Sequence, residues 1–218
     1  MTLTLVIGNK NYSSWSMRPW VALKAAGIPF EEVRIPLYTG AADKQRILDV
    51  TPAGKVPALV DDDITVWDSL AIIEYVAERF PHAGLWPEDR AGRAHARSIS
   101  AEMHSGFAAL RNECGMNLHR PVGAKPLSEN ARADIARIQQ IWSDCRARYG
   151  KAGPYLFGAL SAVDAMYAPV VHRFRTYAID VTPAVRDYMA AMNALPAFAQ
   201  WTEAGLAETL LIERFETD

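Results

Sequence analysis

The chain has 218 residues, of which half are hydrophobic and 22% are charged. This composition supports a packed core and excludes a globally disordered chain. The 23 basic and 25 acidic side chains give a net charge of −2, which leaves no basic excess for neutralising phosphates and disfavours a nucleic-acid-binding protein.

The first part of the chain alternates between strand and helix patterns. The helix pattern over 16–26 ends at Gly27, because glycine is typical of the position after a helix. Two short strand patterns flank the three aspartates at 61–63, which predicts a hairpin. The predicted order is strand 3–8, helix 16–26, strand 30–35, helix 41–49, strands 56–60 and 64–66, and helix 68–80. This order is typical of an α/β sheet layered with helices.

The segment 81–90 separates this part from a helical remainder. It contains two prolines and a glycine, so we interpret it as a linker. The helix patterns beyond it cover 91–118, 128–149, 161–174, 183–193 and 196–206. The sequence therefore predicts an α/β domain at 1–82 and an all-α domain at 91–218.

Cysteine usage and hydropathy favour a cytoplasmic protein. Cys114 and Cys145 lie far apart and form no CxxC motif, so they indicate packing residues in a reducing compartment. The apolar run at the N-terminus is too short for a signal peptide and lacks a basic segment before it. The longest uncharged stretch, 188–202, is shorter than a membrane span. We therefore expect no membrane or nucleic-acid partner.

Residues 12–18 read YSSWSMR and fall between the first predicted strand and the first predicted helix. Backbone N–H groups at a helix N-terminus attract anions, and the same field lowers the pKa of a thiol. A serine hydroxyl at this turn can therefore donate a hydrogen bond to a thiolate that a cofactor brings. The alternative is an ordinary helix cap, which serines often provide.

Two further element starts carry candidate binding groups. A cis Val56–Pro57 bond would turn the backbone N–H and C=O of Val56 outward to pair with an extended peptide, whereas the alternative is an ordinary trans proline. Asp68 and Ser69 begin the next helix, where they could cap it or bind the amino and carboxylate groups of a ligand. In a sheet of the predicted order, the start of the first helix, the start of the strand at 56–60 and the start of the helix at 68–80 lie close together.

Together, these residues make the whole chain resemble the cytosolic glutathione transferases. The segment 13–18 resembles the SSCSxR motif of the zeta class, the maleylacetoacetate isomerases, and 55–57 matches the valine that precedes a cis proline in this superfamily. The segment 68–75, DSLAIIEY, resembles the superfamily's (E/Q)SLAIIEYL segment. Ser161 and Asp164 resemble the N-capping box of its helical domain, where both residues have a structural role.

This resemblance implies a thioredoxin-like domain followed by an all-α domain, with glutathione as co-substrate and no metal. It implies that Ser13 is the best candidate for holding the glutathione thiolate. Ser14 is the second candidate, since the start of the helix decides which hydroxyl points at the sulfur. The other glutathione contacts that the resemblance implies are Lys55, Val56, Asp68, Ser69 and Asn112.

Three positions depart from the zeta pattern. Trp15 stands where zeta enzymes have a cysteine, which argues against a mixed disulfide at this turn. Ala108 stands where they have a glutamine. Thr176 falls where they use an arginine to hold the substrate carboxylate, although Arg173 and Arg175 are close by. These departures weigh against isomerisation of maleylacetoacetate.

We expect a pocket for the second substrate between the first helix and the helix predicted at 91–118. For Met103 and Phe107 the alternative is plain core packing. His104 could act as a general acid or base, or only as a hydrogen-bonding side chain. Arg111 could steer an anionic substrate or pair with a neighbouring acid. The full set of candidates is Tyr12, Trp15, Met103, His104, Phe107 and Arg111.

The residues and the resemblance lead to an enzyme that activates the thiol of glutathione for attack on a small hydrophobic electrophile, as in detoxification. One alternative is a glutathione-dependent cis–trans isomerase of the zeta type. Another is a non-enzymatic protein that retains the fold for binding. The resemblance also implies a homodimer.

Overall fold

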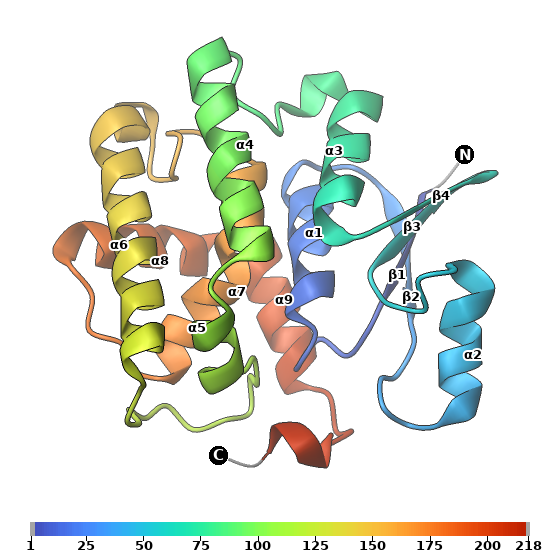
Figure 1. The fold of residues 1–218 in the computed structure, drawn as a ribbon. Helices are drawn as coiled ribbons and strands as arrows, with labels where there is room; N and C mark the ends of the chain where they lie inside the picture. The colour runs from blue at the N-terminus through green and yellow to red at the C-terminus, as the bar shows by residue number, and fades with distance from the viewer. Residues whose placement is uncertain (1–2, 217–218) are drawn as a thin grey trace.

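The computed structural model describes residues 3–216 (Figure 1). Its first part consists of β1 (Leu3–Ile7), α1 (Ser14–Ala25), β2 (Phe30–Arg34), α2 (Ala41–Val50), β3 (Ala58–Asp61), β4 (Ile64–Trp67) and α3 (Ser69–Arg79). The four strands form one mixed sheet in the order β2-β1-β3-β4. β1 pairs parallel with β2 and antiparallel with β3, and β3 pairs antiparallel with β4.

Alternate residues of β1 face opposite sides of the sheet and contribute to two cores. Leu3, Leu5 and Ile7 are buried in the main core, together with apolar residues of α1 and α3. Val6 points the other way and packs with Ile47 of α2. The two-residue period of a strand thus places α1 and α3 on one face of the sheet and α2 on the other (Figure 1).

The second part of the chain is helical and packs against the first. Its helices are α4 (Arg90–Ser105), α5 (Ala108–Glu113), α6 (Glu129–Tyr149), α7 (Ala162–Thr176), α8 (Pro183–Ala194) and α9 (Pro196–Leu206). Short 3-10 turns lie at Pro81–Ala83, Gly150–Ala152 and Glu213–Phe215. α7 packs against both α1 and α4, and every residue of α7 except Arg175 is buried. Within residues 3–216 no helix combines the length and the apolar character that crossing a membrane requires.

The predicted fold class is confirmed, and its elements appear in the predicted order. The single helix predicted over 91–118 is wrong, because α4 ends before Gly106 and α5 begins after Phe107. A Cβ atom at Gly106 would lie 2.7 Å from the carbonyl oxygen of Glu102, and Phe107 has a left-handed φ of 57°. The chain therefore changes direction here, although the apolar spacing continues on both sides.

The predicted N-capping box of Ser161 and Asp164 is present at the start of α7, and both side chains are buried. The carboxylate of Asp164 accepts hydrogen bonds from the backbone N–H groups of Leu156 (3.1 Å) and Ser161 (2.8 Å). It also accepts one from the Ser161 hydroxyl (3.0 Å). Burial raises the pKa of Asp164 to about 6. Asp164 thus joins the loop before α7 to the first turn of that helix.

Both cysteines are free thiols in the interior. Burial raises the pKa of Cys145 to about 12, and it raises the pKa of Cys114 above its ordinary value. Because the thiolate is the reactive form, neither side chain is activated as a nucleophile. The packing role that the sequence indicates for both residues agrees with this burial.

Candidate active site

The loop between β1 and α1 places Ser13 at the N-cap of α1. The Ser13 Oγ accepts a hydrogen bond from the backbone N–H of Ser16 (3.3 Å) and donates one to the Ser16 Oγ (2.8 Å). The Ser16 Oγ in turn accepts from the backbone N–H of Gly8 (3.1 Å). The capping alternative is therefore confirmed for Ser13, whose hydroxyl is engaged within the chain.

Ser14 is the first residue of α1, and its side chain is also buried. Its Oγ lies 3.5 Å from the Nη2 of Arg173, which comes from α7. In that contact the serine oxygen accepts, so the hydroxyl proton of Ser14 stays available as a donor. A donor hydroxyl thus stands at an electropositive helix start with a guanidinium beside it.

The loop before β3 and the start of α3 carry the other predicted binding groups. The Val56–Pro57 peptide bond is cis, as in the first of the two alternatives. Lys55 is exposed and Val56 is half-buried. Asp68 caps α3, because its Oδ1 accepts from the two backbone N–H groups at the beginning of the helix at 2.9 and 3.3 Å. The Oγ of Ser69 is buried and has no hydrogen-bond partner among the described residues.

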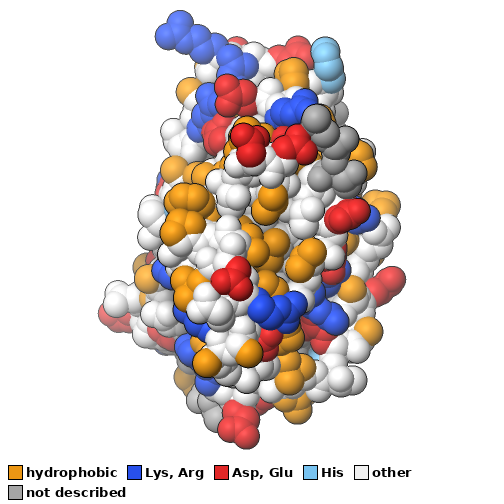
Figure 2. Space-filling view, turned by 90° about the vertical axis from the view of Figure 1, so that its right-hand side faces the viewer, with side chains coloured by type: hydrophobic (Ala, Val, Ile, Leu, Met, Phe, Trp, Pro, Cys, Tyr) orange, Lys and Arg blue, Asp and Glu red, His pale blue; other side chains and the backbone are white. Residues whose placement is uncertain are grey.

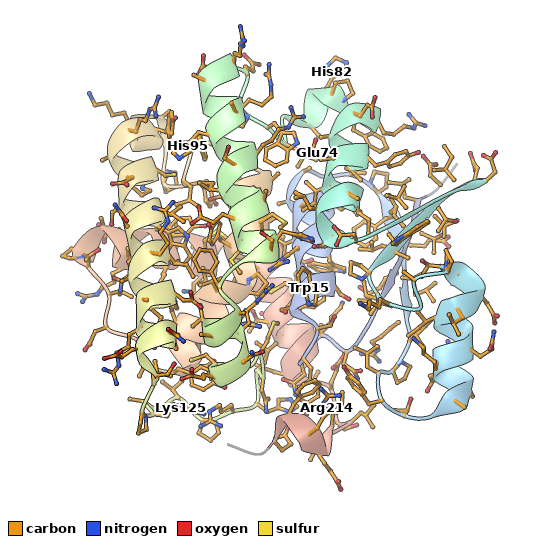
Figure 3. The ribbon with its side chains drawn as sticks, viewed as in Figure 1. Trp15, Glu74, His82, His95, Lys125 and Arg214 are labelled. Atoms are coloured by element: carbon orange, nitrogen blue, oxygen red, sulfur yellow. The ribbon has the colours of Figure 1, made fainter. Side chains whose placement is uncertain are left out.

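Trp15 is the centre of a cluster in which the sheet part meets the helical part (Figure 3). Its ring meets the His104 ring of α4 edge-on, with 5.3 Å between centroids. The Cζ of Arg18 lies 4.2 Å from the Trp15 ring centroid, and the Cζ of Arg111 from α5 lies 5.4 Å from it. The Nε2 of His104 is 3.3 Å from the Oδ2 of Asp68. The cluster therefore connects the starts of α1 and α3 to α4 and α5.

Three arginines give this junction a concentrated positive charge. Arg18 is 1% exposed and Arg173 is 6% exposed. Burial, with a smaller contribution from neighbouring arginines, lowers the pKa of Arg18 to about 9 and the pKa of Arg173 to about 10. Burial also lowers the pKa of Arg111. Desolvation is the main cause of all three shifts, and repulsion between the arginines adds to it for Arg18 and Arg173.

The other predicted pocket residues lie elsewhere. Met103 and Phe107 are buried in the main core, as in the packing alternative. Tyr12 faces the C-terminal segment instead of Trp15: its hydroxyl is hydrogen-bonded to Glu216, and its ring lies 5.5 Å from the Phe215 ring. Asn112 is exposed on α5. Trp15, His104 and Arg111 are the candidates that the fold brings together.

Sequence reasoning did not assign Arg18 and Arg173 to this site. In the sequence, Arg18 is part of the motif at 13–18 and Arg173 is a residue close to Thr176, and neither is predicted to have a binding role. A usable signal was present, because Arg173 is the one basic residue besides His172 in the mostly apolar segment 162–174. Charged side chains are almost never fully buried unless they are paired, so a buried arginine on a helix indicates a specific interaction. Among residues 3–216, no group of three His, Cys, Asp or Glu side chains is placed to hold a metal ion.

Comparison with known proteins identifies the family. The model of the glutathione S-transferase N-terminal domain matches residues 12–79, and that of the C-terminal domain matches residues 94–204. Maleylacetoacetate isomerase of Rattus norvegicus is 32% identical over 196 residues, which cover 85% of this chain and 86% of the rat protein. The chain belongs to the glutathione S-transferase family. The family that the sequence motifs indicated is thus confirmed.

Further relatives of this glutathione transferase support the same assignment. Glutathione S-transferase Z2 of Arabidopsis thaliana is 28% identical over 204 residues, covering 87% of this chain and 88% of the plant protein. A glutathione transferase homologue from Burkholderia, solved with bound glutathione, is 26% identical with a TM-score of 0.71, covering 95% of this chain and 100% of that one. The matched N-terminal region contains Trp15, and the matched C-terminal region contains His104 and Arg111.

Proposed function

We propose that this glutathione transferase holds glutathione across the starts of α1 and α3. The observation that carries the proposal is the unpartnered, fully buried hydroxyl of Ser69, which stands beside the carboxylate of Asp68 at an electropositive helix start. A buried polar atom without a partner is costly unless a ligand satisfies it. Ser69 and Asp68 would bind the carboxylate and the amino group of the γ-glutamyl end. Lys55, Val56 and Asn112 remain proposed contacts.

We propose that Ser14, rather than Ser13, donates the hydrogen bond to the glutathione sulfur. The hydroxyl of Ser13 is occupied in capping α1, whereas the hydroxyl of Ser14 has a proton to donate. A hydrogen bond to the thiolate favours the charged form and lowers the pKa of the thiol. The thiol proton then passes to water. The thiolate attacks the electrophilic carbon and, in an aryl halide, halide leaves with the electron pair of its bond to carbon.

Binding can be tested by titrating the protein with glutathione and following the heat of binding. Replacing Ser69 by Ala is expected to raise the Kd for glutathione about 10- to 100-fold, because a hydrogen bond to a charged carboxylate is lost. Ser98→Ala is the matched control, because Ser98 is exposed on α4 and bonds only to its own helix. Wild-type protein that does not bind glutathione, or a Ser69→Ala variant that binds as tightly as the control, would contradict the site.

A second candidate function is cis–trans isomerisation with glutathione returned unchanged. It is favoured by the rat relative named maleylacetoacetate isomerase. Against it stands Thr176, which occupies the position of the zeta arginine and is buried near the end of α7. The two functions differ in whether glutathione is consumed, so measuring remaining thiol during turnover separates them.

We also propose that the protein is a cytoplasmic homodimer. The side of the molecule that carries the sheet exposes hydrophobic side chains among charged ones (Figure 2). On the edge strand β4, Ile64 and Trp67 are 46% and 44% exposed, and a partner chain on this side would bury both. Light scattering is expected to give twice the 24.1 kDa of the chain. A mass equal to one chain at micromolar concentration would contradict the dimer.

A further inference from the structure

The turn between β1 and α1 leads into Ser14, and a segment remote in the sequence holds part of its backbone. α9 runs beside α1 and ends next to this turn (Figure 1). The backbone N–H groups of Lys10 and Asn11 donate hydrogen bonds to the carboxylate of Glu208, at 2.8 and 3.1 Å. The backbone carbonyl of Lys10 accepts one from the Nε1 of Trp201 (3.1 Å). Three successive backbone polar groups of the turn therefore have their partners in α9 and just after it.

These contacts lie in the interior, where backbone groups need a partner. Lys10 and Asn11 are 6% and 0% exposed, and Glu208 is 8% exposed. A buried backbone N–H that loses its acceptor keeps the full cost of its desolvation. α9 can approach the turn this closely because residue 205 is glycine. A Cβ atom at Gly205 would lie 3.2 Å from the carbonyl carbon of Lys10 and 3.3 Å from the nitrogen of Asn11.

The carboxylate of Glu208 has one further partner, which is of a different kind. The Nη1 of Arg34, on β2, donates to its Oε1 at 2.8 Å. The side chain of Arg34 is 50% exposed, so water can solvate the guanidinium if this contact is lost. The buried N–H groups of the turn have no such substitute. The carboxylate is therefore needed by the turn more than by Arg34.

The held turn leads directly into the two serines of the candidate site. The backbone carbonyl of Asn9 accepts hydrogen bonds from the N–H groups of Tyr12 (3.3 Å) and Ser13 (2.8 Å). These bonds connect the residues that Glu208 binds to the first turn of α1. A displacement of the turn would therefore move the hydroxyl of Ser14. Hydrogen bonds weaken steeply away from their preferred angle, and small misplacements at a reacting centre are costly.

We propose that Glu208 is a positioning residue for catalysis: by binding the backbone of Lys10 and Asn11, it sets the position from which Ser14 donates to the glutathione sulfur. The proposal rests on the proposed function, in which Ser14 stabilises the thiolate. Glu208 lies beyond residue 204, where the match to the C-terminal family model ends. The proposal thus gives the segment after α9 a part in the thiolate site.

The proposal can be tested by a double-mutant cycle that follows the pKa of the thiol of bound glutathione, measured from the absorbance of the thiolate. Ser14→Ala is expected to raise this pKa by about one unit, because a hydrogen bond to the charged form is lost. Glu208→Ala is expected to raise it by about 0.5 to 1 unit when Ser14 is present and to leave it unchanged when Ser14 is already Ala, because coupled side chains are not additive. A purely structural role would not depend on Ser14.

Arg34→Met is the matched control, because it removes the exposed partner of Glu208 and leaves both backbone contacts in place. Its bound thiol is expected to titrate as in the wild type. Glu208→Gln keeps one acceptor oxygen, so it is expected to raise the pKa less than Glu208→Ala, and it serves as the second variant if alanine prevents folding.

A thiol pKa that stays at the wild-type value in a folded Glu208 variant would overturn the proposal and leave the proposed function intact. An equal rise with and without Ser14 would also overturn it, since Glu208 would then act on the thiol by another route. A wild-type protein that binds no glutathione, or whose bound thiol titrates near the free value of about 8.5, would overturn the proposed function itself.

Discussion

Replacing Ser14 by Ala is expected to lower the kcat for glutathione conjugation about 10-fold near neutral pH and to change the KM for glutathione little. The hydrogen bond from Ser14 favours the thiolate by about one pKa unit, so its loss reduces the fraction of bound glutathione that is ionised by up to about 10-fold. The contacts proposed at α3 are to the γ-glutamyl end of glutathione, so affinity is expected to be retained. Steady-state kinetics with a neutral aryl halide at saturating glutathione measure the effect.

Ser13→Ala is the matched control for this substitution. It removes the cap of α1 and is expected to cost about 1 kcal/mol of stability, which lowers the Tm by roughly 2–4 °C for a chain of this size. Its kcat is expected to stay within a few-fold of the wild type. The reverse pattern, a large loss of kcat in Ser13→Ala and none in Ser14→Ala, would restore the assignment that the motif alone favours.

Replacing Asp164 by Ala is expected to have the largest effect on stability. Two backbone N–H groups and one hydroxyl, all in the interior, lose their acceptor. Leaving a buried donor unsatisfied costs about 1–3 kcal/mol, so the variant is expected to lose about 3 kcal/mol or more. At roughly 2–4 °C for each kcal/mol, the Tm falls by about 6–12 °C.

Asp144→Ala provides the comparison, because Asp144 is an exposed carboxylate on α6. Its Tm is expected to stay close to that of the wild type, since surface substitutions usually change stability by no more than about 0.5 kcal/mol. If Asp164→Ala unfolds at the same temperature as Asp144→Ala, the network at the start of α7 does not stabilise the fold as argued.

Local signals explain what the sequence predicted correctly. The strand and helix order followed from hydrophobic period, and the cap at Ser161 and Asp164 followed from a motif whose partners are three residues apart. The break at Gly106 and Phe107 was missed because apolar spacing continues through it and a lone glycine is a weak helix stop. The left-handed backbone of Phe107 could not be predicted, because phenylalanine is not a residue type that favours positive φ.

The composition of the site depends on contacts that no local pattern contains. Arg111 contacts Trp15 and Arg173 contacts Ser14, although both arginines are remote in the sequence from the start of α1. The choice between Ser13 and Ser14 depended on where α1 begins, and a motif fixes that boundary only within a residue or two. Tyr12 was misplaced because the C-terminal segment that it contacts is remote in sequence.

The pKa of the thiol of bound glutathione tests the central claim most directly. It can be measured from the ultraviolet absorbance of the thiolate as the pH of the binary complex is raised. A hydrogen bond from Ser14 and the nearby guanidinium both favour the thiolate, so the pKa is expected to fall from about 8.5 for a free thiol to about 7 or below. Ser14→Ala is expected to raise it again by about one unit. A bound thiol that titrates near 8.5 in the wild type, or equally in both proteins, would contradict the account.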